Sequence, residues 1–124
     1  METKFFKCRH CGNIIAYVHS SGVKVVCCGE QMQELVPNTV DASHEKHLPV
    51  VVREGNTVTV TIGSAEHPML PEHHIEWICL ETQKGRQRMS LKIGEKPVGV
   101  FYISPDDQVV AAFAYCTLHG LWKK

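Results

Sequence analysis

The 124-residue sequence lacks a net charge, a membrane-length apolar run and a helical repeat of apolar residues. Thirteen Lys and Arg balance thirteen Asp and Glu, and residues 1–37 alone carry four basic and three acidic side chains. This balance argues against the basic surface that nucleic-acid-binding proteins present. No apolar stretch approaches the roughly 18 residues that a membrane-spanning helix needs. We therefore expect neither a nucleic-acid partner nor a membrane partner.

Cysteine and histidine are unusually frequent for a chain of this length, with six cysteines and eight histidines. The opening METKFFKCRHCG contains no apolar segment followed by a small-residue cleavage site, so it does not read as a secretory signal and we expect a cytoplasmic protein. In a reducing compartment, closely spaced cysteines indicate metal binding, with three disulfides as the alternative.

The composition changes near residue 37, which predicts a small N-terminal module over residues 1–37 and a larger domain over residues 38–124. A module this short usually needs a metal, disulfides or a partner chain to fold. Within it, the apolar runs 14–18 and 23–26 flank a turn-like segment and predict a hairpin.

The larger part predicts short strands without helices between them. Residues 57–62 alternate with a period of two, which places Val58, Val60 and Ile62 on one face and three threonines on the other. Similar runs occur at residues 48–52, 74–81, 87–93, 98–103 and 109–115. Six or seven short strands separated by turn residues predict a mainly β domain, an antiparallel sandwich or barrel.

The four early cysteines form two half-sites for a metal. Cys8 and Cys11, followed by Gly12, make the C-x-x-C-G knuckle that brings two thiolates to one ion. Cys27 and Cys28 are adjacent, and adjacent side chains of an extended chain diverge, so this half should distort the tetrahedron. Four thiolates accept zinc or iron, and the spacing does not choose between a structural zinc ribbon and a one-electron iron centre.

Histidines gather near predicted strand ends around a late cysteine. His47 precedes the first strand of the larger part, His67 and His73 lie in a loop with two prolines, and Cys116-x-x-His119 follows the last predicted strand. Ligands carried by loops at strand ends of a sandwich can converge at one end of the fold. Together these residues indicate a second metal site.

The residue pattern leaves one choice open in this second set. His73 and His74 are adjacent and should point to opposite sides of an extended chain, so either one, but not both, is expected to bind the same ion.

Cys79 lies in the middle of an apolar strand pattern and is interpreted as a small buried hydrophobic residue.

Taken in order, these motifs resemble desulfoferrodoxin, the two-iron form of superoxide reductase. The matching segments are residues 8–12, 27–29, 45–50, 67–69, 73–77 and 116–123. The resemblance runs nearly end to end. It implies a desulforedoxin-like domain with an Fe(Cys)4 centre over residues 1–37, and an immunoglobulin-like antiparallel β-sandwich with a catalytic iron over residues 38–124.

The resemblance also assigns residues. It implies nine iron ligands, which are Cys8, Cys11, Cys27 and Cys28 for the first centre and His47, His67, His73, His119 and Cys116 for the second. It thus selects His73 over His74. It implies Glu45 as the carboxylate that can occupy the open position in the oxidised state, and Lys46 as the cation beside the opening.

The implied activity is the one-electron reduction of superoxide to hydrogen peroxide. The implied partners are a rubredoxin-like electron donor and a second copy of the chain in a homodimer. Two other functions fit the residues. One is an electron-transfer iron protein without superoxide activity, and the other is a structural zinc-binding β-sandwich protein.

Overall fold

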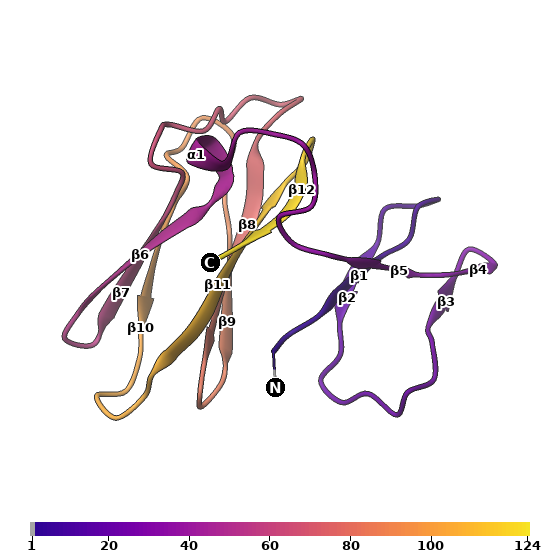
Figure 1. Ribbon diagram of the computed structural model, residues 1–124, viewed down its shortest axis with the longest axis horizontal. Coiled ribbons are helices and arrows are strands. Elements are labelled where there is room, and N and C mark those ends of the chain that lie inside the picture. Colours follow the sequence, from indigo (N-terminus) through magenta and orange to yellow (C-terminus); the bar gives the residue numbers. More distant parts are fainter. Residues whose placement is uncertain (1) are drawn as a thin grey trace. The chain divides into compact units, whose positions relative to one another are not determined.

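Residues 2–124 are described by a computed structural model, in which strands dominate and helix is confined to one turn (Figure 1). The chain divides into two compact units, one extending to Val36 and the other spanning Pro37–Lys124. Within residues 2–124, no helix has the length and apolar character needed to span a membrane.

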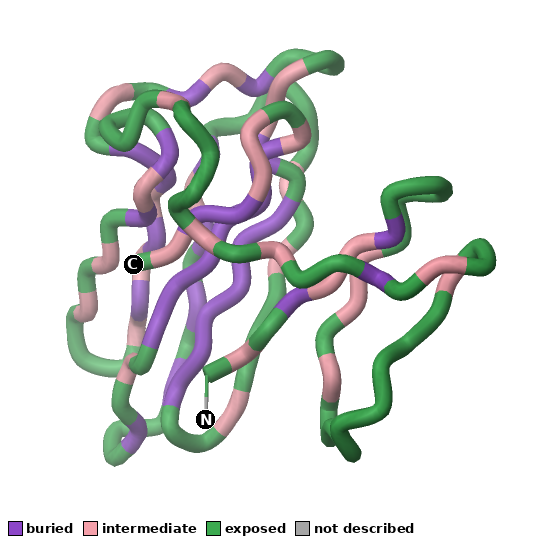
Figure 2. Tube along the Cα trace, turned by 45° about the vertical axis from the view of Figure 1, so that its right-hand side comes forward, coloured by how far each residue is buried: buried purple, intermediate pink, exposed green. Residues whose placement is uncertain are grey.

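The first unit consists of very short strands. They are β1 (Phe5–Lys7), β2 (Ile14–Ala16), β3 (Val26–Cys27), β4 (Glu30–Gln31) and β5 (Gln33–Leu35). β1 is the central strand of an antiparallel sheet ordered β2-β1-β5, and β3 pairs only with β4. Most positions of this unit are exposed or half-buried (Figure 2), so it has little apolar core.

The predicted hairpin between residues 14–18 and 23–26 is wrong. β2 pairs with β1, and β3 pairs with β4 around a two-residue turn made by Cys28 and Gly29. β1 was not expected, because three residues are too few to display a periodic pattern. The turn was not expected either, because a cysteine rarely adopts the positive φ of 54° that Cys28 has.

The second unit is an antiparallel β-sandwich, as predicted. One sheet has the order β10-β7-β6 and the other has the order β12-β11-β8-β9. The strands are β6 (Pro49–Glu54), β7 (Thr57–Ile62), β8 (Ile75–Thr82), β9 (Arg86–Ser90), β10 (Val98–Tyr102), β11 (Val109–Cys116) and β12 (Gly120–Lys123). The first six correspond to the six predicted runs, whereas β12 was not predicted.

The core lies between the two sheets. Val58, Val60 and Ile62 of β7 are at most 1% exposed, which confirms the predicted alternation, and they join a cluster that includes Ile78 of β8 and Trp122 of β12. Buried positions follow these strands closely (Figure 2). The sandwich is therefore a rigid support for the loops at its ends.

One helical turn, α1 (His44–His47), precedes β6 and corrects the expectation of a domain without helices. Its Leu48 N–H donates to the His44 carbonyl over 2.9 Å. Four residues cannot show an apolar repeat of 3.6 residues, so this helix could not be predicted from periodicity. The turn buries His47 and leaves Glu45 and Lys46 exposed.

The loop after β7 is hydrogen-bonded to α1 and the residue that follows it. Gly63 N–H donates to the Leu48 carbonyl over 3.0 Å, and Ala65 N–H donates to the Glu45 carbonyl over 3.0 Å. Gly63 is buried and has a φ of 83°. These contacts fix α1 relative to the loop that carries His67.

Asn38 anchors the start of the second unit to β12. Its backbone N–H donates to the Leu121 carbonyl (3.1 Å) and its side-chain amide donates to the Lys123 carbonyl (3.0 Å). In return, Lys123 N–H donates to Asn38 Oδ1 over 2.9 Å. Asn38 has a φ of 63°, a left-handed conformation that asparagine tolerates better than most residues.

Candidate metal centres

The four early cysteines converge within the first unit. The sulfur atoms of Cys8, Cys11, Cys27 and Cys28 all lie within 4.8 Å of one another. Cys11 and Cys27 place their Sγ atoms 3.6 Å apart. The two half-sites read from the sequence therefore face a common point.

Turn geometry explains how adjacent cysteines both reach this point. Cys28 and Gly29 have φ values of 54° and 76°, and this pair of positive angles is the signature of the tight hairpin turn between β3 and β4. The expectation that adjacent side chains diverge holds for an extended chain. A turn redirects Cys28 towards Cys27 instead.

Hydrogen-bond donors from the backbone and from a side chain also point at the sulfur atoms. Cys11 N–H donates to Cys8 Sγ over 3.5 Å, and the Asn13 side-chain amide donates to Cys27 Sγ over 3.7 Å. The Cys11 backbone contact is the main reason that the pKa of Cys8 falls to about 6. The neighbouring Cys11 and Cys8 sulfurs raise the pKa of Cys28 to about 12. Four sulfurs this close cannot all ionise without a cation, so this set fits a metal ion.

The later histidines and cysteine converge at one end of the sandwich. One ligand atom from each of His47, His67, His73 and Cys116 lies within 4.8 Å of the other three. His119 joins them, because its Nδ1 lies 3.1 Å from His47 Nε2 and 3.9 Å from Cys116 Sγ.

These residues come from separate segments that meet at this end. His47 ends α1, which lies at the top of Figure 1, while His67 and His73 lie in the loop between β7 and β8. Cys116 ends β11, after a register shift at Tyr115 in its pairing with β8, and His119 lies in the turn before β12. His47 and Cys116 are thus held at the ends of a helix and a strand, and the other three histidines lie in the connections at the same end of the sandwich.

The four imidazole rings form a closed cycle. Neighbouring rings meet edge to face, with centroid distances of 4.6 Å for His47–His67, 4.8 Å for His67–His73, 5.0 Å for His73–His119 and 4.9 Å for His119–His47. Across the cycle, His47 and His73 are 6.3 Å apart and nearly parallel, at 25°. This is a square arrangement of four nitrogen donors around one point.

The outer nitrogens of two rings are tied to backbone carbonyls. His47 Nδ1 donates to the Ser43 carbonyl over 2.6 Å, and His67 Nδ1 donates to the Pro68 carbonyl over 2.7 Å. These bonds place the proton on Nδ1 and leave the Nε2 lone pair directed inward. A carbonyl partner on the outer nitrogen is the usual support of a metal-binding histidine.

The inner nitrogens fit a metal ion better than they fit one another. His47 Nε2 lies 3.1 Å from both His67 Nε2 and His119 Nδ1, but three inward-facing acceptors cannot satisfy each other. His73 Nε2 is buried and has no hydrogen-bond partner among residues 2–124. A single cation would satisfy all four nitrogens.

Burial prepares these side chains for metal binding. Desolvation lowers the pKa of His67 to about 4 and also lowers the pKa values of His47 and His73, so these imidazoles are neutral at pH 7. Desolvation raises the pKa of Cys116, although its sulfur accepts the His119 N–H over 3.4 Å. Binding of a cation at this site would displace the thiol proton.

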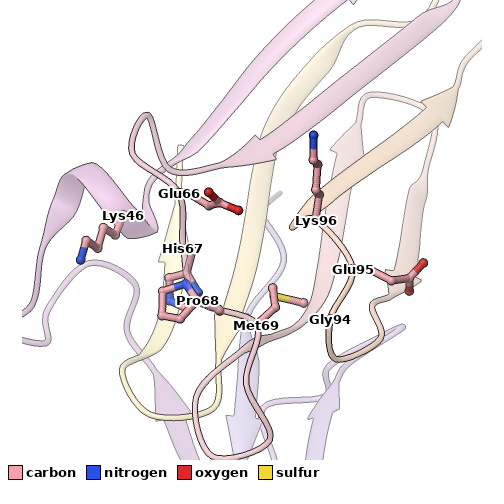
Figure 3. Close-up of a pocket in the computed structure, with 8 residues that line it drawn as sticks. All are labelled: Lys46, Glu66, His67, Pro68, Met69, Gly94, Glu95 and Lys96. Carbon is pink, nitrogen blue, oxygen red and sulfur yellow. Dashed lines mark hydrogen bonds between the residues drawn. The ribbon is translucent and has the colours of Figure 1, made fainter.

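Glu45 and Lys46 lie beside this cluster, next to His47 in the sequence. A cavity of about 510 Å³ is lined by Lys46, Glu66, His67, Pro68, Met69, Gly94, Glu95 and Lys96 (Figure 3). Lys46 and Lys96 occupy opposite sides of it, and the side chain of Lys46 extends away from Lys96. Two lysines and two glutamates leave this cavity without a net formal charge.

His74 and Cys79 belong to neither group of metal-binding side chains. His74 Nδ1 donates to the Leu70 carbonyl over 2.9 Å, and the structure brings His73, not His74, to the cluster. Cys79 is 5% exposed, so its interpretation as a buried residue is confirmed. All six cysteines are free thiols, which excludes the disulfide alternative in this structure.

The groups that support the histidines could not be predicted from the sequence. The Ser43 and Pro68 carbonyls that accept from the histidines cannot be recognised in a sequence, because every residue has a backbone carbonyl whatever its side chain. Trp122 stacks on His47 with ring centroids 4.7 Å apart. In the sequence it was noted only as a member of the matching segment 116–123.

Fold and sites together define a class of protein: a two-centre metalloprotein with a four-cysteine module and a β-sandwich that carries a four-histidine, one-cysteine site. Two family models match the chain, described as desulfoferrodoxin, N-terminal domain, over residues 1–35 and as desulfoferrodoxin over residues 39–124. The chain belongs to the desulfoferrodoxin family.

Known proteins resemble it along nearly its whole length. The desulfoferrodoxin of Nitratidesulfovibrio vulgaris is 43% identical over 98% of this chain and 95% of its own length. A desulfoferrodoxin homolog of Archaeoglobus fulgidus is 44% identical over 95% of this chain and 93% of its own length. The crystal structure of the superoxide reductase from Treponema pallidum aligns with a TM-score of 0.84 and 40% identity, covering 100% of this chain and 99% of that one.

Proposed function

We propose that this protein is a superoxide reductase that uses two iron centres. The observation that supports this proposal is the square of four imidazoles with Cys116 beside it. These five residues would hold the ion and would leave it accessible to one small ligand. Iron bound there would supply one electron to superoxide and would then be reduced again by an external donor.

The reaction is superoxide plus one electron and two protons giving hydrogen peroxide. Neutral imidazoles would not reduce the cation's positive charge, and the single Cys116 thiolate would offset only part of it, so the site would keep a net positive charge that favours an anionic substrate. When iron is bound, the Cys116 thiolate would donate electron density to it, as the thiolate does in haem–thiolate enzymes. We assign Glu45, exposed on α1, as the carboxylate that would bind the iron in its oxidised state.

The decisive experiment measures superoxide consumption by the iron-loaded protein with an excess of reductant. One hydrogen peroxide per superoxide, with no dioxygen produced, is the expected result. Equal yields of dioxygen and hydrogen peroxide, each half of the superoxide consumed, would indicate dismutation. A redox-active protein that consumes no superoxide would be an electron carrier. A colourless, zinc-containing protein would be the structural alternative, because oxidised iron–thiolate centres absorb visible light.

Lys46 is proposed to attract superoxide to the site. Replacing it with alanine should lower the second-order rate constant with superoxide about 10-fold, within the range of electrostatic steering, and should flatten its dependence on ionic strength. Stopped-flow or pulse-radiolysis measurements at several salt concentrations give both quantities.

Lys84→Ala is the matched control. Lys84 lies in the turn after β8, at the opposite end of that strand from His73, and its removal changes the net charge equally. If both variants behave alike, net charge and not the position of Lys46 governs the rate.

We propose that residues 1–37 form an Fe(Cys)4 domain and residues 38–124 form the catalytic domain. A rubredoxin-like protein is the proposed electron donor, and the proposed assembly is a homodimer. Six free thiols fit a reducing compartment, so we infer a cytoplasmic location.

Cys28→Ser should disturb only the first centre. It removes one of four sulfurs there, and we expect loss of the visible bands of that iron together with its release to a chelator. Superoxide reduction with an artificial donor should stay within about threefold of the unmodified protein, since none of the five proposed ligands of the second centre changes. Loss of activity while the second iron remains bound would instead show that electrons must pass through the first centre.

A further inference from the structure

Trp122 is the largest buried side chain beside the four-histidine cluster. It is 0% exposed and lies on β12, paired with Ala114 of β11. Its ring stacks on the imidazole of His47 with centroids 4.7 Å apart and an interplanar angle of 23°. It also meets His44 edge to face, with centroids 5.2 Å apart at 82°.

His47 is therefore restrained in two independent ways. The hydrogen bond from Nδ1 to the Ser43 carbonyl fixes one atom of the ring, but a single bond still allows the ring to rock about that atom. The stacked indole fixes the plane of the ring. Only with both restraints is the Nε2 lone pair held towards the point that the other imidazoles face.

The same strand also determines the position of a second histidine. His119 lies immediately before β12, and Trp122 lies within it, so a shift of β12 would move both the His119 ring and the surface on which His47 rests. His47 and His119 are neighbours in the cycle of rings, at 4.9 Å. β12 thus aligns two adjacent members of the square.

We propose that Trp122 is a positioning residue for the second centre, which holds the His47 imidazole in the plane that iron binding requires. The inference rests on the proposed function, because it concerns the same cluster of ligands. The indole acts through its flat face, since its Nε1 is buried and has no hydrogen-bond partner among residues 2–124. A phenyl ring should therefore replace it, whereas an aliphatic side chain should not.

The test compares Trp122→Phe, Trp122→Leu and Phe101→Leu, each loaded with iron. Phe101 is 3% exposed and belongs to the same core cluster, but it lies on β10 in the other sheet, so its variant controls for general damage to the core. The readouts are the rate at which EDTA removes iron from the second centre and the electron paramagnetic resonance spectrum of that centre when oxidised. The first centre's visible spectrum in the same sample is an internal reference.

Trp122→Leu should release the second iron at least about 10-fold faster, as expected when an outer support of a ligand is lost, and should change the resonance spectrum. Trp122→Phe should stay within about threefold of the unmodified protein and keep its spectrum. Equal behaviour of Trp122→Leu and Phe101→Leu, or failure of phenylalanine to restore the spectrum, would overturn the proposal.

Should Trp122→Leu not fold, the phenylalanine variant and the spectrum of Phe101→Leu still decide the matter. An altered spectrum in Trp122→Phe, or an altered spectrum in Phe101→Leu, contradicts the role of the flat ring. The unmodified protein separates this inference from the proposed function. If it reduces superoxide and the variants show no difference, only the role of Trp122 is wrong, and if it does not reduce superoxide, the proposed function is wrong.

Discussion

Cys116→Ser is expected to abolish the sulfur-to-iron absorption band of the oxidised second centre and to reduce the superoxide rate constant. The loss of rate should exceed the about 10- to 100-fold that removal of an outer-shell partner typically costs. Cys116 is 0% exposed and is the sulfur of the cluster, 3.4 Å from His67 Nε2. A hydroxyl in its place has a far higher pKa and donates much less electron density.

Cys79→Ser is the matched control for this substitution. Cys79 is also buried, at 5% exposure, on the neighbouring strand β8, and it is not a member of either metal cluster. Its serine variant should keep the band and the rate. A band that survives in Cys116→Ser would show that another residue provides the sulfur ligand.

Gly63→Ala is expected to destabilise the second unit by more than about 3 kcal/mol, because two costs combine at this position. The first is the left-handed backbone, with a φ of 83°. The second is steric, since an added Cβ would lie 2.6 Å from the Lys46 carbonyl oxygen and 2.8 Å from its carbonyl carbon. Backbone atoms cannot move aside as the end of a flexible side chain can.

Gly55→Ala separates the two costs. Gly55 also has a positive φ, 62°, but nothing lies within 4 Å of an added Cβ, so only the backbone cost of about 1–2 kcal/mol applies. Urea unfolding followed by tryptophan fluorescence measures both variants, since the two tryptophans, Trp77 and Trp122, lie in the second unit. Equal losses in the two variants would show that the loop shifts freely around Gly63.

A displaced Gly63 loop should also affect function. Gly63 and Ala65 donate to carbonyls at either end of the segment that carries Lys46 and His47. We expect folded Gly63→Ala protein to lose iron from the second centre faster than Gly55→Ala protein does.

The sandwich could be predicted because its signals are periodic. β7 alternates buried and half-buried residues along its whole length. Six residues are enough to recognise a pattern of period two in the sequence. α1, β1 and β12 were missed because they contain three or four residues each, fewer than a period-based argument requires. Their places are set by tertiary contacts, such as the pairing of β12 with β11.

The candidate ligands could be identified from chemistry, but their geometry could not. Cysteine and histidine are the residue types that most often bind transition metals, so the spacing Cys116-x-x-His119 predicted a metal site without any structure. The choice between His73 and His74 depends on the path of a loop, and the residues by themselves left it open. The pairing of Cys27 with Cys28 depends on a left-handed turn that propensity argues against.

The contacts of Asn38 have a consequence for how copies of this chain can associate. An edge strand offers unpaired N–H and carbonyl groups to any extended segment that approaches it. On β12, the Leu121 carbonyl and both backbone groups of Lys123 are already bonded to Asn38. The Asn38 contacts therefore hinder intermolecular strand addition along β12, which leaves β9 as the other edge strand of this sheet where an extended segment could pair.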